Sequence, residues 1–290
     1  MDSVPQLIAM RPLEVFFVGA AAVLLSAVMA WWIVRRLRAP LWKGLVWVWQ
    51  RASRTWPDLS RLRLPVAWLG SILLLDLLLG FAVVLTAIGA FFEVADEIDL
   101  DEELGAMDNA IASELARSAS PATLRTFAWV THLGDAAVQW GIGIGAALLL
   151  VATGRRFLAV TWIAAVAGNG ALNRLLKAWF ERDRPLHEHG FAMADGWSFP
   201  SGHASGAVAV YGMLAYLACR ASPPAWRLPI VLAALLVVLL VGYSRVVLQV
   251  HYVSDVLAGF LTAGAWLIVC VGAAHMVQVH NRHRSSAPRG

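Results

Sequence analysis

The sequence predicts an all-α protein that crosses a membrane many times. Of its 290 residues, 59% are hydrophobic and 14% are charged, whereas soluble domains have about 45–50% apolar and about 25% charged residues. Apolar stretches long enough to span a bilayer recur along the chain, and basic and acidic connectors alternate between them. This pattern favours a polytopic helix bundle over a soluble domain or a nucleic-acid-binding protein.

Seven apolar stretches are long enough, at about 1.5 Å per residue, to cross about 30 Å of hydrocarbon. They cover residues 13–34, 66–92, 124–152, 157–178, 202–220, 227–245 and 253–275. The first ends at Arg35-Arg36 and lacks a small-residue cleavage site, so we expect a retained anchor. After it, the tryptophans and bases of residues 41–49 suit either a helix lying in the membrane interface or a cytoplasmic loop.

The connectors indicate which side of the membrane each segment faces. Arginine and lysine dominate residues 35–63 and the tail 276–290, whereas aspartate and glutamate dominate residues 93–120. Basic residues accumulate on the cytoplasmic side of membrane proteins. We therefore expect a protein of the inner (plasma) membrane whose acidic segment and loop 179–201 face the periplasm or exterior.

Three short polar clusters fall on the predicted outer side. They are Lys177 to Arg184-Pro185, Pro200-Ser201-Gly202-His203, and Ser244-Arg245 with His251 and Asp255. Each is weak alone, because a terminal Lys or Arg is commonly a snorkelling anchor and Ser-Gly before a helix is commonly a cap. Together they place cations, imidazoles and a carboxylate at one membrane depth.

The cations of these clusters predict a bound anion. Charges near hydrocarbon are costly and normally face a polar cavity or one another, yet Lys177, Arg184 and Arg245 lack an equal number of anions nearby. Arginine forks and lysine point charges both suit phosphate oxygens. Ser201 and Gly202 stand where a helix begins, so backbone N–H groups are expected to point at the same phosphate.

The histidines suggest what happens to that phosphate. His251 and Asp255 are four residues apart and share a helical face. A carboxylate on one imidazole nitrogen fixes the tautomer and leaves the other nitrogen free as a nucleophile. His203 then becomes the candidate acid that protonates the leaving oxygen.

The three clusters resemble the signature of the type 2 phosphatidic acid phosphatase family, which also includes soluble vanadium haloperoxidases. That signature reads Lys, six residues, Arg-Pro; then Pro-Ser-Gly-His; then Ser-Arg, five residues, His, three residues, Asp. The sequence matches it from Lys177 to Asp255 with no departure. The resemblance covers about residues 66–275 and implies a six-helix phosphatase core, preceded by the added span of residues 1–65 and followed by the cytoplasmic tail 276–290.

The resemblance also implies a role for each matched residue. His251 attacks phosphorus to form a phosphohistidine, Asp255 orients it, and His203 protonates the leaving group and then activates water. The phosphoryl oxygens are held by Lys177, Arg184, Ser201, Gly202 and Arg245. The resemblance implies neither a metal nor another cofactor.

Polar residues outside the signature are assigned structural roles. We expect His187, Glu188, His189 and Asp195 to form a solvated loop rather than a metal site, and His132 and Asp135 to pack beside the site. Asp76 is expected to pair with Asn169, Asn173 or Arg174 within the bundle. The acidic segment 96–118 suits either an amphipathic surface helix, with Leu100, Leu104, Met107 and Ile111 at helical spacing, or a solvated connector.

Together these features predict a metal-independent membrane lipid phosphatase. Undecaprenyl diphosphate is the favoured substrate, because an outward-facing site suits a carrier recycled from outside, and phosphatidate and phosphatidylglycerophosphate are the other candidates. A phosphotransferase using the same phosphohistidine is one alternative, and a lipid transporter without turnover is another. A transporter is disfavoured because no inverted repeat is visible. The partners expected are the substrate and membrane lipids, with no nucleic acid, and the sequence does not indicate an oligomeric state.

Overall fold

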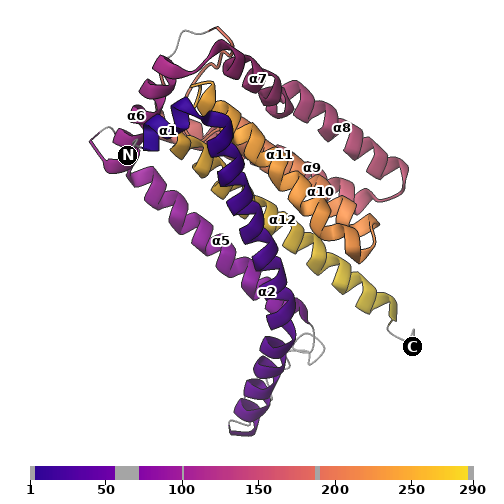
Figure 1. Cartoon of the computed structure of the whole chain (residues 1–290). Helices are drawn as coiled ribbons and strands as arrows, with labels where there is room; N and C mark the ends of the chain where they lie inside the picture. The colour runs from indigo at the N-terminus through magenta and orange to yellow at the C-terminus, as the bar shows by residue number, and fades with distance from the viewer. Residues whose placement is uncertain (1–3, 56–71, 100, 187–189, 287–290) are drawn as a thin grey trace.

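The computed structural model describes residues 4–55, 72–99, 101–186 and 190–286, and every regular element within them is a helix (Figure 1). The elements are α1 (Val4–Met10), α2 (Pro12–Thr55), α5 (Ile72–Asp96), α6 (Glu103–Ser118), α7 (Pro121–Thr131), η1 (His132–Gly134), α8 (Ala136–Ala152), α9 (Arg156–Phe180), α10 (Gly202–Ala221), η2 (Pro224–Trp226), α11 (Arg227–Val247) and α12 (Val253–Ser286). The predicted all-α membrane bundle is thereby confirmed.

Six stretches of the described residues are long and apolar enough to cross a membrane. They are Pro12–Leu41, Leu77–Asp96, Pro121–Ala152, Gly202–Ala221, Pro224–Val247 and Val253–Gln278. Helix α9, predicted as a seventh span, has 25 residues but is not among them. Its C-terminal half carries Asn169, Asn173, Arg174 and Lys177, which lower its hydropathy. It nevertheless packs against α8, α10 and α12 inside the bundle.

Helix α10 is the centre of the bundle, and it packs against α8, α9, α11 and α12. Close approach is possible because small residues lie at the contacts. A Cβ on Gly259 of α12 would lie 2.8 Å from the carbonyl oxygen of Ser201, and one on Gly206 of α10 would lie 2.1 Å from Oε1 of Gln139. Small interfacial residues are the usual means of bringing membrane helices together. The resulting core holds the N-terminus of α10 tightly against its neighbours.

The third predicted span is not one continuous helix. The chain leaves α7 through the single turn of η1 and begins α8 after Asp135, whose backbone is extended (φ −64°, ψ 144°). Gly134 is required at this break, because a Cβ there would lie 2.6 Å from Val241 and 2.9 Å from the ring of His203. The break therefore brings a polar turn directly against the start of α10.

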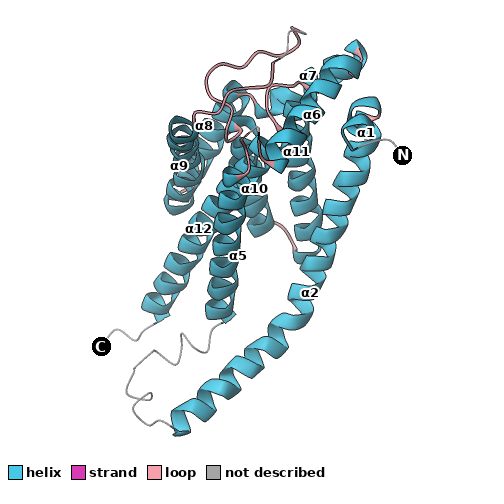
Figure 2. Cartoon of the chain, turned by 90° about the vertical axis from the view of Figure 1, so that its left-hand side faces the viewer, coloured by secondary structure: helices cyan, strands magenta, loops and turns pink. Residues whose placement is uncertain are grey.

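Two helices extend beyond the apolar spans predicted for them. The basic segment 41–49 is helical and continues α2 without interruption, and α12 continues past residue 276 to Ser286. The predicted boundary between residues 65 and 66 lies outside the described residues. Figure 2 shows the long α2 running alongside the bundle and extending beyond its lower end.

Helix α6 is the amphipathic helix expected in the acidic segment, but its buried face differs from the predicted one. Gly105, Asp108, Ile111 and Leu115 are buried, whereas Met107 is exposed; Leu100 lies outside the described residues. The difference arises because α6 turns a carboxylate inward, at Asp108. It lies with α1 at the end of the bundle opposite the C-terminus (Figure 1).

The indole of Trp162 supplies a test of how α8 and α9 are joined. Its side chain is 1% exposed, and its Nε1 donates to the carbonyl oxygen of Gly143 at 2.8 Å. Trp162→Phe removes this interhelical hydrogen bond, which is worth about 0.6 to 2 kcal/mol in membrane proteins. We expect thermal unfolding of the purified protein in detergent to occur a few degrees lower. An unchanged midpoint would contradict this account of the α8–α9 contact.

Candidate active site

His251 lies in the turn between α11 and α12, and the carboxylate of Asp255 orients its ring. The Nδ1 atom is 3.2 Å from Oδ2 of Asp255, and the backbone N–H of Tyr252 donates to the same oxygen at 2.9 Å. Burial lowers the pKa of His251 to about 3, with Arg184 and Arg245 acting in the same direction and Asp255 opposing them. His251 is therefore neutral near pH 7, and its Nε2 is the nitrogen turned away from Asp255.

Arg184 faces that second nitrogen. One of its terminal nitrogens lies 3.2 Å from Nε2 of His251 and donates to the carbonyl oxygen of Val250 at 2.6 Å. The other donors of the guanidinium bind the carbonyl oxygens of Asp195, Gly196 and Trp197. The loop before α10 therefore holds this cation at the imidazole edge where an incoming phosphate is expected.

Arg245 gives the clearest indication that this site can bind an anion. The residue is 3% exposed, and Nη1 donates to the hydroxyl of Thr131 on α7 at 2.7 Å. Its Nε is buried and has no hydrogen-bond partner within the part of the chain that the structure describes. A buried donor without a partner is costly, and an anion between Arg245 and His251 would supply one.

Lys177 and the start of α10 border the same site. The Nζ of Lys177 donates to the carbonyl oxygens of Trp197 and Ser198, and the hydroxyl of Ser198 lies 3.2 Å from Nδ1 of His251. The N–H of Ser201 donates to the carbonyl oxygen of Asp255 at 2.9 Å. This last bond locks the N-terminus of α10, with its positive dipole end, against the start of α12.

His203 also has a carboxylate partner, which is Asp135. From the sequence alone, Asp135 is expected only to pack beside the site. The Nε2 of His203 lies 3.0 Å from Oδ1 of Asp135, and Oδ2 of Asp135 lies 2.6 Å from Nδ1 of His132. Exposure falls along this row, from 59% for the His132 side chain to 26% for His203. The break between η1 and α8 therefore builds a His–Asp–His row that runs from the surface into the site.

A second set of residues that sequence analysis missed holds Asp255 from behind. Arg182 donates to Oδ1 of Asp255 at 2.8 Å and to Oδ2 of Asp108 at 3.1 Å. It also donates to the hydroxyl of Ser254, which in turn donates to Asp108. Burial raises the pKa of Asp108, against the effects of Ser254 and Arg182. The pairing explains why α6 buries an acidic side chain.

The backbone at the end of α9 makes this arrangement possible. Glu181 adopts a left-handed conformation (φ 45°) that ends the helix. The chain then turns, so that Arg182 points at Asp255 while Arg184, two residues later, reaches His251. Residues two positions apart in an extended segment point to the same side, so the position of Arg182 two residues before Arg184 is a signal that could have identified it from the sequence. Asp108 offered no such signal among its acidic neighbours.

Two other expectations concern residues that are only partly described. His187, Glu188 and His189 lie outside the described residues, as does the side chain of Asp76. Within the described residues 4–55, 72–99, 101–186 and 190–286, no group of three or more His, Cys, Asp or Glu side chains is arranged to hold a metal ion. The backbone oxygen of Asp195 accepts a hydrogen bond from Arg184, so this part of the loop supports the site through its main chain.

Comparison with known proteins agrees with this geometry. The family model described as PAP2 superfamily matches residues 158–278, a range that includes all three clusters. Phosphatidylglycerophosphatase B of Bacillus subtilis is 32% identical over 165 residues, which are 53% of this chain and 76% of that protein. A lipid A 1-phosphatase of Rhizobium johnstonii is 35% identical over 123 residues, or 38% of this chain and 46% of that protein.

A solved structure gives the same result for the fold. The crystal structure of a transmembrane PAP2 type phosphatidylglycerolphosphate phosphatase from Bacillus subtilis matches with a TM-score of 0.62 and 25% identity, covering 67% of this chain and 96% of that one. The likeness therefore extends beyond the range of the family model, although it does not span the whole chain.

The contacts of Arg182 lead to a test of its role. Arg182→Lys keeps the charge but removes the planar fork that joins Asp255, Ser254 and Asp108, and the two cations are not interchangeable at such a site. We expect kcat for phosphate release to fall about tenfold or more, which corresponds to about 1.4 kcal/mol. Arg117→Lys, at the exposed end of α6, is the matched control. Equal rates in both variants would refute the positioning role.

Proposed function

Because this chain belongs to the PAP2 superfamily, we propose that its clustered cations and histidines remove the terminal phosphate of a lipid through a phosphohistidine. The chain is a multi-pass membrane phosphatase of the PAP2 type. The observation that best supports the proposed chemistry is the geometry of His251, whose ring contacts Asp255 with one nitrogen and faces Arg184 with the other.

In the first step, Nε2 of His251 attacks phosphorus and the bond from phosphorus to the lipid oxygen breaks. His203, as the imidazolium, gives its proton to the departing oxygen. Arg184, Arg245, Lys177 and the start of α10 at Ser201 and Gly202 hold the phosphoryl oxygens, whose charge is spread in a loose transition state. The buried, unpartnered Nε of Arg245 supports its place in this set.

In the second step, water attacks the phosphohistidine. His203, now neutral, takes a proton from that water, the phosphorus–nitrogen bond breaks, and its electron pair returns to Nε2 of His251. Inorganic phosphate leaves, and His203 is again protonated. Asp135 takes part by holding Nε2 of His203, which leaves the other ring nitrogen to exchange the proton and stabilises the imidazolium.

Undecaprenyl diphosphate is the substrate that we favour, with the site on the periplasmic or outer side of the inner membrane. The site lies at the same end of the bundle as the acidic helix α6, whereas the C-terminus, close to the basic tail, lies at the other end (Figure 1). This distribution supports the orientation through the positive-inside rule. Phosphatidylglycerophosphate is the second candidate, because a relative that is 32% identical bears the name phosphatidylglycerophosphatase B.

Replacement of the nucleophile tests the proposed chemistry. His251→Ala is expected to abolish phosphate release from undecaprenyl diphosphate and phosphatidylglycerophosphate, and to abolish labelling of the protein by substrate with a labelled terminal phosphate. His275→Ala, an exposed histidine near the other end of the bundle, is the matched control. Near-normal release by the His251 variant would overturn the mechanism. Label that moves to a lipid or sugar acceptor, rather than to solution, would instead identify a phosphotransferase.

The role of Asp135 is tested by varying the leaving group. Asp135→Asn weakens the support of the general acid, which contributes about 10² to 10⁴ in rate where protonation is needed. We expect kcat to fall by about a hundredfold for alkyl phosphate lipids, but much less for p-nitrophenyl phosphate, whose leaving group needs no proton. Asp101→Asn, an exposed carboxylate, serves as control. An equal loss for both substrates would indicate a purely structural role.

A further inference from the structure

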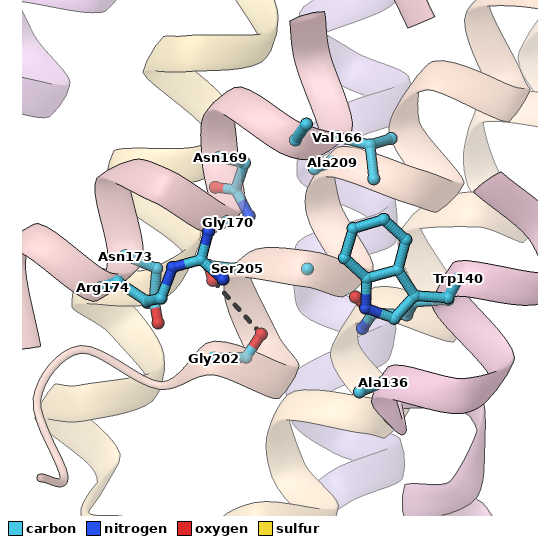
Figure 3. A pocket seen from close by; sticks show the side chains of 13 residues that line it. Ala136, Trp140, Val166, Asn169, Gly170, Asn173, Arg174, Gly202, Ser205 and Ala209 are labelled. Carbon is cyan, nitrogen blue, oxygen red and sulfur yellow. Dashed lines mark hydrogen bonds between the residues drawn. The ribbon is translucent and has the colours of Figure 1, made fainter. Parts of the chain in front are cut away.

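A polar crevice lies beside the phosphate site, between α8, α9 and α10 (Figure 3). It has a volume of about 160 Å³, which is many times what a single water molecule needs. Its polar lining comes from Gln139 and Trp140 on α8, Asn169, Asn173 and Arg174 on α9, and Ser205 on α10. Such a lining is unusual for a cavity between membrane-spanning helices, where polar side chains commonly mark a functional path.

Two of these side chains lack partners. Arg174 and Asn169 make no hydrogen bond or ion pair with other residues in the described part of the chain, although Asn169 is only 4% exposed. By contrast, Asn173 donates to the carbonyl oxygen of Pro200 at 3.2 Å, and Gln139 donates to that of Gly134 at 2.9 Å. Figure 3 shows the side chain of Arg174 extending into the crevice. A cation and a buried amide therefore face the same space.

The crevice adjoins the phosphate site at Gly202. This residue lines the crevice and belongs to the Pro-Ser-Gly-His turn, and a Cβ at its position would lie 3.3 Å from Oδ1 of Asn173. Arg174 stands one helical turn before Lys177, on the same side of α9. Gly202 and the neighbouring turn of α9 from Arg174 to Lys177 therefore connect the crevice with residues expected to hold the terminal phosphate.

From this arrangement we infer that the crevice binds a second phosphate of the substrate, one that is not cleaved. The inference rests on the proposed function and narrows its substrate class to lipids that carry two phosphates. A guanidinium fork suits phosphate oxygens, and the amide of Asn169 supplies an N–H donor beside it. Arg174 is exposed, so an anion arriving at the crevice can reach it, and the buried amide of Asn169 would gain a hydrogen-bond partner.

Two kinds of lipid satisfy this requirement. In a polyprenyl diphosphate the second phosphate follows the terminal one directly, and in phosphatidylglycerophosphate it follows after one glycerol. Phosphatidate carries a single phosphate, so its headgroup leaves the crevice without an anion. A comparison of the three lipids therefore distinguishes binding in the crevice from binding at the site that holds the phosphate to be cleaved.

The test compares wild type with Arg174→Gln on all three lipids in detergent micelles. We expect KM for undecaprenyl diphosphate and for phosphatidylglycerophosphate to rise about tenfold, equivalent to about 1.4 kcal/mol of binding, and KM for phosphatidate to rise far less. A rise for only one of the two double phosphates identifies which spacing the crevice fits. Arg156→Gln, at the opposite end of the same helix, is the matched control.

Asn169→Leu provides a second variant, which removes the amide donor without changing charge. Both variants should shift the same ratio of KM values, and turnover of phosphatidate verifies that each is folded. An equal effect on all three lipids, or none, overturns the crevice inference alone, as does a wild-type enzyme that cleaves only phosphatidate. If the wild type releases phosphate from none of them, the proposed function fails, and the crevice inference fails with it.

Discussion

The carboxylate of Asp255 is the point on which the site depends. Its side chain is fully buried, and its oxygens accept hydrogen bonds from Arg182, Ser198 and the backbone of Tyr252 while one of them contacts His251. A buried carboxylate is tolerated only when it is paired and fully hydrogen-bonded. These partners come from the loop before α10, from the α11–α12 turn and, through the contact of Arg182 with Asp108, from α6. The hydrogen bonds that stabilise this one carboxylate therefore hold together segments that are far apart in the sequence.

The balance of charge around Asp255 explains why cations remain available for substrate. Arg182 lies between Asp108 and Asp255, at 3.1 Å from the first and 2.8 Å from the second. These two carboxylates are therefore paired with a cation other than the ones expected to bind phosphate. Arg184, by contrast, binds mainly backbone carbonyls, and Arg245 binds a hydroxyl. Neutral partners position these side chains without cancelling their charge. A phosphate dianion would then meet preorganised cations that need little rearrangement.

Much of this arrangement follows from the sequence, because spacing carries it. The spacing of four positions from His251 to Asp255 places both on one helical face, and Pro-Ser-Gly-His before an apolar run predicts a helix start. Asp135 and Asp108 escaped the same reasoning for a physical reason. Asp135 gains its role from a break between α7 and α8 that an apolar run conceals, and Asp108 pairs with a residue 74 positions away. Contacts of this range depend on tertiary packing, which local periodicity does not encode.

The breaks in the helices explain why the chemistry sits at one end of the bundle. Inside hydrocarbon, a helix must satisfy its own backbone, so irregular turns are tolerated only where protein or water covers them. Here the turn at η1, the loop before α10 and the α11–α12 turn contribute His132 and Asp135, Ser198, and His251 respectively. Ser198, in the loop before α10, contacts both His251 and Asp255, and Tyr211 of α10 donates to the carbonyl oxygen of Leu133 in η1. Protein groups therefore cover the irregular backbone at this end. The constraint that confines irregular backbone to the ends of the bundle thus gathers these three turns, and the side chains they carry, at one of those ends.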